Sequence, residues 1–211
     1  MAIGTAAPRR PYRGKRLLDL VALAAAALPA LLAGAAAALA LWLADGPPVL
    51  FRQQRAGLDG RPFVLLKLRT MRHGAIAIGA EESEVTAVGR VLRRLSVDEI
   101  PQLINVLRGD MSLVGPRPTL PYQVQRYDQR QRGRLSVLPG LTGLAQVHGR
   151  QQLSWPQRIE WDLRYVENQS LRLDVAVIIL TVWTVLTGAG STSTHDGDPI
   201  ARLEKRPETS V

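Results

Sequence analysis

The sequence predicts an α+β fold that is mostly helical and is held at a membrane by its N-terminal segment. Three observations lead to this prediction. Residues 17–43 form an apolar run with one charge, Asp19. Two strand-like runs on either side of Asp59-Gly60 predict a short β-hairpin. Short helical segments follow, the clearest of them at residues 100–107, where apolar residues recur with helical spacing.

The apolar run exceeds the roughly 20 residues that a membrane-spanning helix needs, and the ~7–15 apolar residues of a cleaved signal peptide. Pro29, near its middle, predicts a kink or break. Residues 9–16 and 52–72, the two flanks, are both basic. Because basic flanks prefer the cytoplasm, we predict a re-entrant helix-break-helix with both ends on one face. A straight single span is the alternative.

The body of the chain begins with residues 49–55 and 62–69, the two runs of the hairpin. Residues 86–95 predict a short helix, and residues 122–134 a polar one. Ser154 predicts the cap of a helix over residues 155–167, with Pro156 at its start. Residues 138–143 are interpreted as a loop. Residues 175–186 are apolar but too short to span, so they predict either a core helix or an interfacial one.

Composition restricts the chemistry. The chain has 27 Lys and Arg against 18 Asp and Glu, a formal charge of +9, which favours an anionic partner: nucleic acid, anionic lipid or a phosphorylated substrate. It has no Cys, which excludes disulfides, Cys-zinc sites and a cysteine nucleophile. His73, His148 and His195 are too far apart for metal-ligand spacing. The sequence contains no P-loop and no GxGxxG motif, which argues against a stored nucleotide cofactor.

Asp98 and Glu99 stand where the helix over residues 100–107 begins, and two interpretations stay open. Ser96-x-x-Glu99 matches a capping box, and Asp98 is itself a plausible N-cap. The same two acids also suit a nucleophile and a ligand for a hard cation.

The basic residues near this acid pair also have two interpretations. Lys67 and Arg69 share a strand face, and Arg93 precedes Asp98 by five residues. They suit one edge of a cradle for a diphosphate. A solvated or lipid-facing surface is the alternative.

Five segments together resemble a known family. They are VLFRQQRAGLDGRPF (49–63), KLRTM (67–71), VGRVLRRLSVDEIPQLINVLRGDMSLVGPRP (88–118), LPGLTGLAQVHGR (138–150) and WDLRYVENQSLRLD (161–174). The chain resembles the bacterial sugar transferases that move a hexose-1-phosphate onto a polyprenyl phosphate, also called monotopic phosphoglycosyl transferases. The resemblance runs from Lys15 to about Thr187 and fits the minimal catalytic form.

The resemblance implies a reaction and a site. A UDP-sugar would transfer its phosphosugar to undecaprenyl (polyprenyl) phosphate with release of UMP, the first membrane step of a surface glycan or glycoconjugate pathway such as exopolysaccharide biosynthesis. Asp98 matches the nucleophile that forms an aspartyl phosphosugar, and Glu99 the acid that holds Mg²⁺. The matching substrate-binding positions are basic residues and a turn near the uridine: Lys67, Arg93, Arg150 and Pro116-Arg117-Pro118, to which we add Arg69 from the strand argument.

The resemblance also implies a location and an organisation. Residues 1–45 would form a basic segment and a re-entrant membrane hairpin, and residues 46–187 a catalytic domain with interfacial amphipathic helices. This domain would lie on the cytoplasmic face of the bacterial inner membrane. Independently of the resemblance, residues 188–211 are rich in Gly, Ser, Thr and charge, which predicts a disordered tail. Many members carry Ser-Pro at the membrane break, whereas this chain has Leu28-Pro29.

Two rival functions remain at this point. One is a membrane-anchored glycosyltransferase that releases UDP. The other is a non-enzymatic basic module that binds anionic lipid; the sequence shows no nucleic-acid motif. The sugar, the polyprenol length and the oligomeric state, including a homo-oligomer, stay open.

Overall fold

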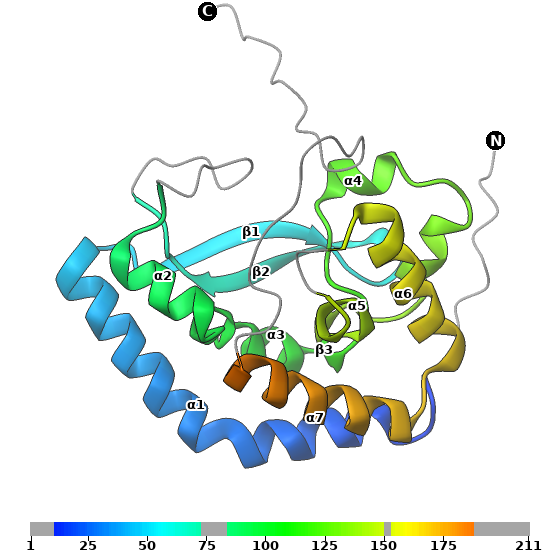
Figure 1. The fold of residues 1–211 in the computed structure, drawn as a ribbon, viewed down its shortest axis with the longest axis horizontal. Coiled ribbons are helices and arrows are strands. Elements are labelled where there is room, and N and C mark those ends of the chain that lie inside the picture. Colours follow the sequence, from blue (N-terminus) through cyan, green and yellow to red (C-terminus); the bar gives the residue numbers. More distant parts are fainter. Residues whose placement is uncertain (1–10, 73–83, 150–152, 188–211) are drawn as a thin grey trace, which may run out of the picture.

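The computed structural model describes residues 11–72, 84–149 and 153–187. Arg150, His73, His195 and the predicted tail lie outside these residues. The described chain is mostly helical, as Figure 1 shows, and has two small sheets. One long helix runs beneath a body made of short helices and the hairpin. The predicted α+β class is confirmed at this level.

The N-terminal apolar run forms helix α1, Lys15–Asp45. Within the described part of the chain it is the one helix long and apolar enough to cross a membrane. The helix continues through Pro29 instead of ending there, and Figure 1 shows that it bends along its length. A proline removes one helical hydrogen bond and crowds the preceding turn, which bends a helix without necessarily ending it.

Both ends of α1 pack against the same body. At its start, Lys15 and Asp19 are buried: Lys15 Nζ lies 2.5 Å from Asp174 Oδ2, and Asp19 Oδ1 accepts a hydrogen bond from Ser112 Oγ at 2.9 Å. Toward its end, Ala37 and Leu41 are buried in a cluster with Leu68 and Leu92. The outward surface between these contacts is apolar and exposed, with Leu28, Leu31 and Leu32 each more than 60% exposed.

Strands β1, Leu50–Ala56, and β2, Pro62–Leu68, form the predicted antiparallel hairpin. The connection contains the short turn η1, Leu58–Gly60, in which Asp59 has φ 53° and Gly60 φ 77°. Asp and Gly tolerate this left-handed region better than other residues, which explains why the sequence signal was correct. At its end, β1 meets a distant segment, because Ala56 N donates to Thr119 O at 2.8 Å.

A second sheet was not predicted. Strands β3, Ser112–Val114, and β4, Gly140–Thr142, pair in parallel, so part of the predicted loop at 138–143 is a strand. Three glycines allow the backbones to meet: a Cβ on Gly115 would lie 2.5 Å from Leu138 O, and one on Gly143 would lie 2.2 Å from Gly115 O. A Cβ on Gly140 would lie 2.1 Å from Gly115 N. Three-residue strands have too little pattern to be predicted from sequence.

Helix α2, Ala87–Arg94, confirms the predicted helix at 86–95, and Thr86 Oγ1 caps it by accepting from Gly89 N at 3.0 Å. It leads into the 3₁₀ turn η3, Val97–Glu99, and then α3, Gln102–Arg108. The capping box predicted from Ser96-x-x-Glu99 is wrong. Ser96 has φ 56° and its side chain caps nothing, because the left-handed residue turns the chain between α2 and η3.

The C-terminal half is a set of short helices. The predicted polar helix at 122–134 is wrong as one element, because α4 is only Pro121–Gln125 and a 3₁₀ segment, η4, covers Gln131–Ser136. Helix α5 is Leu144–Val147. Helix α6, Trp155–Asn168, confirms the prediction from Ser154 and Pro156. Helix α7, Leu171–Thr187, buries Val177 but exposes Ile179 and Trp183. It therefore has both a core side and an exposed apolar side.

Candidate active site

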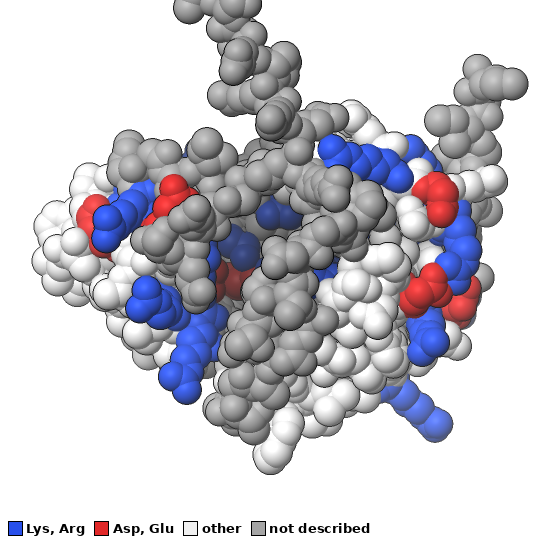
Figure 2. Space-filling view, turned by 45° about the horizontal axis from the view of Figure 1, so that its top comes forward, with Lys and Arg blue, Asp and Glu red and all other residues white. Residues whose placement is uncertain are grey.

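The acid pair lies in η3, the turn between α2 and α3. Asp98 is 6% exposed, and its Oδ2 lies 3.9 Å from Lys67 Nζ on β2. The pair therefore faces the hairpin instead of capping its own helix. Figure 2 shows basic and acidic side chains close together near the centre of the view.

Glu99 joins two basic residues from distant parts of the chain. Its Oε1 accepts from Lys67 Nζ at 2.7 Å and from Arg117 Nη2 at 2.7 Å. Lys67 belongs to β2, and Arg117 follows β3. Glu99 therefore forms ionic contacts with basic residues carried by both sheets. Half of the Arg117 side chain stays exposed, at 48%, so its guanidinium is accessible to a ligand.

The two neighbouring acids have different pKa values. Burial raises the pKa of Asp98; the charge of Lys67 opposes this effect, and that of Glu99 adds to it. Burial also acts to raise the pKa of Glu99, but the charges and hydrogen bonds of Arg117 and Lys67 outweigh it and leave that pKa far below its usual value. Glu99 therefore stays ionised and binds two cations. Asp98 has the longer contact with Lys67, and its carboxyl group is more easily protonated.

Asn105, which sequence reasoning missed, fixes the distance between the acid pair and Lys67. This fully buried residue of α3 donates from Nδ2 to Val64 O at 2.8 Å and accepts from Leu66 N at 3.1 Å. Val64 and Leu66 precede Lys67 on β2. The amide therefore ties the helix that follows Glu99 to the strand that carries Lys67. No residue pattern identifies such a contact in a single sequence.

The other predicted basic residues take different positions. Arg93 donates from Nε to Thr70 Oγ1 at 2.7 Å, and its charge acts on Asp98. Arg69 points elsewhere: its Nη2 donates to Asp45 O and Gly46 O, the carbonyl groups at the end of α1. In this position Arg69 holds the end of the apolar helix. Arg150 lies outside the described residues.

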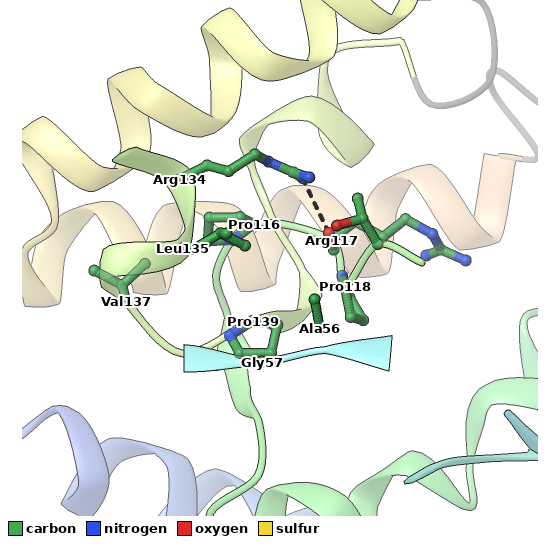
Figure 3. Close-up of a pocket in the computed structure, with 10 residues that line it drawn as sticks. Ala56, Gly57, Pro116, Arg117, Pro118, Arg134, Leu135, Val137 and Pro139 are labelled. Carbon is green, nitrogen blue, oxygen red and sulfur yellow. Dashed lines mark hydrogen bonds between the residues drawn. The ribbon is translucent and has the colours of Figure 1, made fainter. Parts of the chain in front are cut away.

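The Pro116-Arg117-Pro118 turn exposes only its central residue to solvent. Pro116 and Pro118 are buried and Arg117 is exposed, and Figure 3 shows the Arg117 side chain pointing away from Leu135 and Val137. Beside the turn lies a cavity of about 10 Å³, room for about one water molecule and too small for a nucleobase. A contact between this turn and uridine therefore stays a prediction, and in this structure the prolines shape the backbone that carries Arg117.

Arg134, also missed by sequence reasoning, holds this turn from behind. Its Nη2 donates to Arg117 O at 3.0 Å, as Figure 3 shows, and its guanidinium forms a buried ion pair with Asp162 of α6. Its Nη1 donates to Tyr127 Oη at 2.7 Å. The signal in the sequence was present only as the Arg-rich composition of residues 126–134.

The residues present fit a hard cation only in part. Among the described residues no group of three or more His, Cys, Asp and Glu side chains could hold a metal ion. Asp98 and Glu99 supply carboxylates, and the hydrogen bonds of Glu99 with Lys67 and Arg117 use only Oε1. Because Mg²⁺ is usually held by one or two carboxylates together with substrate phosphates, this pair suits a metal that arrives with a phosphorylated ligand.

Comparison with known proteins identifies the family. The bacterial sugar transferase family matches residues 11–188. The chain is 47% identical over 188 residues to the UDP-glucose:undecaprenyl-phosphate glucose-1-phosphate transferase of Caulobacter vibrioides, covering 82% of this chain and 70% of that protein. It is 46% identical over 153 residues to the uncharacterized sugar transferase EpsL of Bacillus subtilis, covering 71% and 76%.

A third relative acts on a different sugar. The UDP-N-acetylgalactosamine-undecaprenyl-phosphate N-acetylgalactosaminephosphotransferase of Aeromonas hydrophila is 41% identical over 167 residues, which cover 74% of this chain and 40% of that protein. The chain belongs to the bacterial sugar transferase family. It is a membrane-associated enzyme of the phosphoglycosyl transferase class.

Proposed function

We propose that the enzyme transfers a hexose-1-phosphate from a UDP-sugar to undecaprenyl phosphate and releases UMP. The observation that carries this proposal is the position of Asp98, a buried carboxylate 3.9 Å from Lys67 and next to the Lys67–Glu99–Arg117 cluster. Phosphoryl transfer depends mostly on positioning and on neutralising charge, and this cluster supplies both. The names of the relatives supply the donor and acceptor classes.

In the first step, an Asp98 oxygen attacks the β-phosphorus of the UDP-sugar. The bond from that phosphorus to the bridging oxygen breaks, and UMP leaves with the electron pair on its phosphate. In the second step, a phosphate oxygen of undecaprenyl phosphate attacks the aspartyl phosphosugar, and the Asp98 carboxylate is restored. Lys67, Arg93 and Arg117 neutralise the donor diphosphate, while Glu99 keeps Lys67 and Arg117 in place.

Mg²⁺ is part of this proposal. Glu99, with Asp98, would hold it together with the donor diphosphate, and the ion would neutralise charge on the phosphates. We further propose that α1 is re-entrant and that the catalytic body lies on the cytoplasmic face of the inner membrane. The re-entrant arrangement is supported by the burial of Asp19 and Leu41, at opposite ends of α1, against the same body.

A product assay tests the reaction. The chain is purified in detergent and incubated with Mg²⁺, undecaprenyl phosphate and a panel of UDP-sugars, and released UMP and UDP are measured separately. We expect UMP from one sugar and none from Asp98→Asn. Asp59→Asn is the matched control, because Asp59 is exposed in the hairpin turn. Release of UDP would identify an ordinary glycosyltransferase, and no turnover with any donor would favour the lipid-binding alternative.

A labelling assay tests the intermediate. With a donor labelled at its β-phosphate and no acceptor, we expect label on the wild-type protein and on Asp59→Asn but not on Asp98→Asn. Adding undecaprenyl phosphate should move the label into lipid. Equal labelling of wild type and Asp98→Asn would refute the covalent step.

Topology has its own test. Because the chain has no Cys, single cysteines report position without background. Arg13→Cys and Arg52→Cys, both at exposed sites, flank α1. We expect a thiol reagent that cannot cross the membrane to label neither in intact spheroplasts and both after lysis. Labelling of Arg13→Cys alone in intact spheroplasts would establish a straight span.

A further inference from the structure

Arg55 is a basic residue at the edge of the site that no motif singled out. It lies near the end of β1 and donates from Nη1 to Pro118 O at 3.1 Å. Its Nε and Nη2 both donate to Gln53 Oε1, at 3.1 and 2.6 Å. Pro118 is the residue after Arg117. The hydrogen bond to Pro118 O therefore holds the Arg55 guanidinium group next to the backbone that carries Arg117.

Arg55 is partly buried and has no carboxylate partner. Among the described residues its hydrogen bonds all go to neutral acceptors, and no Asp or Glu lies within ion-pair distance. Burial, followed by repulsion from the Arg117 charge, lowers the pKa of Arg55 from its usual value to about 10. A neutral donor would satisfy Pro118 O without this electrostatic cost, so hydrogen bonding alone does not explain a cation here.

The charges around Arg55 do not balance. Lys67, Arg93 and Arg117 all act on Asp98, and Arg55 lies in the field of Arg117 and Glu99. Four cations thus surround two carboxylates, which leaves an excess of two positive charges. The diphosphate of a nucleotide sugar carries two negative charges and offers acceptor oxygens to forked guanidinium groups.

We propose that Arg55 and Arg117 together bind the nucleotide phosphate that leaves, so that Arg55 is a substrate-binding residue for the α-phosphate of the donor. Lys67 and Arg93, whose charges act on Asp98, stay with the phosphate that is transferred. When the bond between the β-phosphorus and the bridging oxygen breaks, the electron pair stays on the departing phosphate, and a cation at that oxygen stabilises the developing charge. This inference rests on the proposed transfer reaction.

Direct binding tests this assignment. UMP and uridine are titrated separately into wild type, Arg55→Gln and Arg52→Gln in detergent. Arg52 is an exposed arginine on the same strand, so its substitution removes an equal charge away from the site. Loss of a charge-assisted hydrogen bond predicts that Arg55→Gln weakens UMP binding roughly 10- to 100-fold. We expect uridine binding to be unchanged by either substitution.

The outcomes separate this inference from the proposed reaction. If wild type releases UMP in the assay but Arg55→Gln binds UMP as tightly as wild type, the Arg55 assignment is overturned and the reaction stands. If UMP and uridine affinities fall equally, Arg55 acts only on the fold, and the assignment is again overturned. If wild type releases UMP in the assay but binds no UMP in the titration, the Arg55 assignment is overturned and the reaction stands, whereas absence of UMP release refutes the reaction. Should Arg55→Gln not fold, Arg55→Lys decides in the same way, because it keeps the charge but loses the fork.

Discussion

The carboxyl groups of Asp98 and Glu99 are adjacent in the chain, yet their pKa values are shifted in opposite directions. Burial dominates at Asp98. At Glu99 the charges and hydrogen bonds of two cations outweigh burial. The same turn therefore supplies a carboxylate that titrates above its ordinary range and another that stays ionised.

This difference predicts the acid side of the pH profile. Protonated Asp98 does not attack phosphorus, so kcat/KM for the donor should fall as the pH decreases through a pKa above the ordinary value of 3.8. Because Lys67 lowers the pKa of Asp98, Lys67→Gln should move this acid limb to higher pH, in addition to reducing the rate. Rates of UMP release between pH 4 and 8 provide the measurement. An acid limb at the same pH in wild type and Lys67→Gln would contradict the argument, and Arg61→Gln at an exposed position serves as control.

Substitution of Asn105 should destabilise the protein. Asn105→Ala leaves Val64 O and Leu66 N without their partner in the interior, and each buried unsatisfied group costs about 1–3 kcal/mol. We expect a loss of about 2–4 kcal/mol in the free energy of unfolding, measured by urea denaturation in detergent. Arg108→Ala, on the exposed side of the same helix, should change stability by less than about 0.5 kcal/mol. Equal effects of the two substitutions would mean that Asn105 does not hold β2 to α3.

A single methyl group at Gly89 should disturb the position of Arg93. A Cβ there would lie 2.2 Å from Thr70 O, a backbone atom that has little room to move. Gly89→Ala should therefore push α2 away from Thr70, lower the unfolding free energy by about 1–3 kcal/mol and reduce donor turnover. Arg90→Ala, at an exposed position of α2, is the control. Normal stability and activity of Gly89→Ala would show that α2 does not pack this closely.

The ion pair between Lys15 and Asp174 should hold the start of α1 to α7. Asp174 is fully buried and also accepts from Tyr165 Oη at 2.8 Å. Asp174→Asn leaves the buried ammonium of Lys15 without a counter-charge, which typically costs about 3–5 kcal/mol. Thermal unfolding in detergent should show a clear decrease, whereas Arg172→Ala at an exposed site of α7 should not. A wild-type melting temperature for Asp174→Asn would show that this ion pair does not hold α1 to α7.

The sequence predicted those elements whose signal is local. The Asp59-Gly60 turn, the capped helix after Ser154 and the long apolar run each depend on residues close together in the chain, and each was correct in kind. Ser96 was misinterpreted because a capping box requires an extended backbone, and the serine adopts a left-handed one to reverse the chain.

Only those site residues that the family resemblance covers could be predicted from the sequence. Asp98, Glu99, Lys67 and Arg117 do converge in the structure, but their convergence depends on β2 and β3 being brought to the same turn. Alternation placed Arg69 on the face of Lys67, whereas the end of the strand turns its guanidinium to the carbonyl groups of Asp45 and Gly46. Asn105 and Arg134 act through backbone atoms of other segments, and such partners leave no pattern in one sequence.

The close contact of Gly115, Gly140 and Gly143 has a consequence for any survey of tolerated changes. At each of the three positions the first side-chain carbon would overlap a backbone atom of β3, β4 or the residues beside them. A complete substitution scan scored by donor turnover would therefore report three glycine-only positions with a loss as severe as that at Asp98. Protein abundance measured in the same scan would separate them, because the glycine substitutions deplete the enzyme whereas Asp98→Asn leaves an abundant, inactive one.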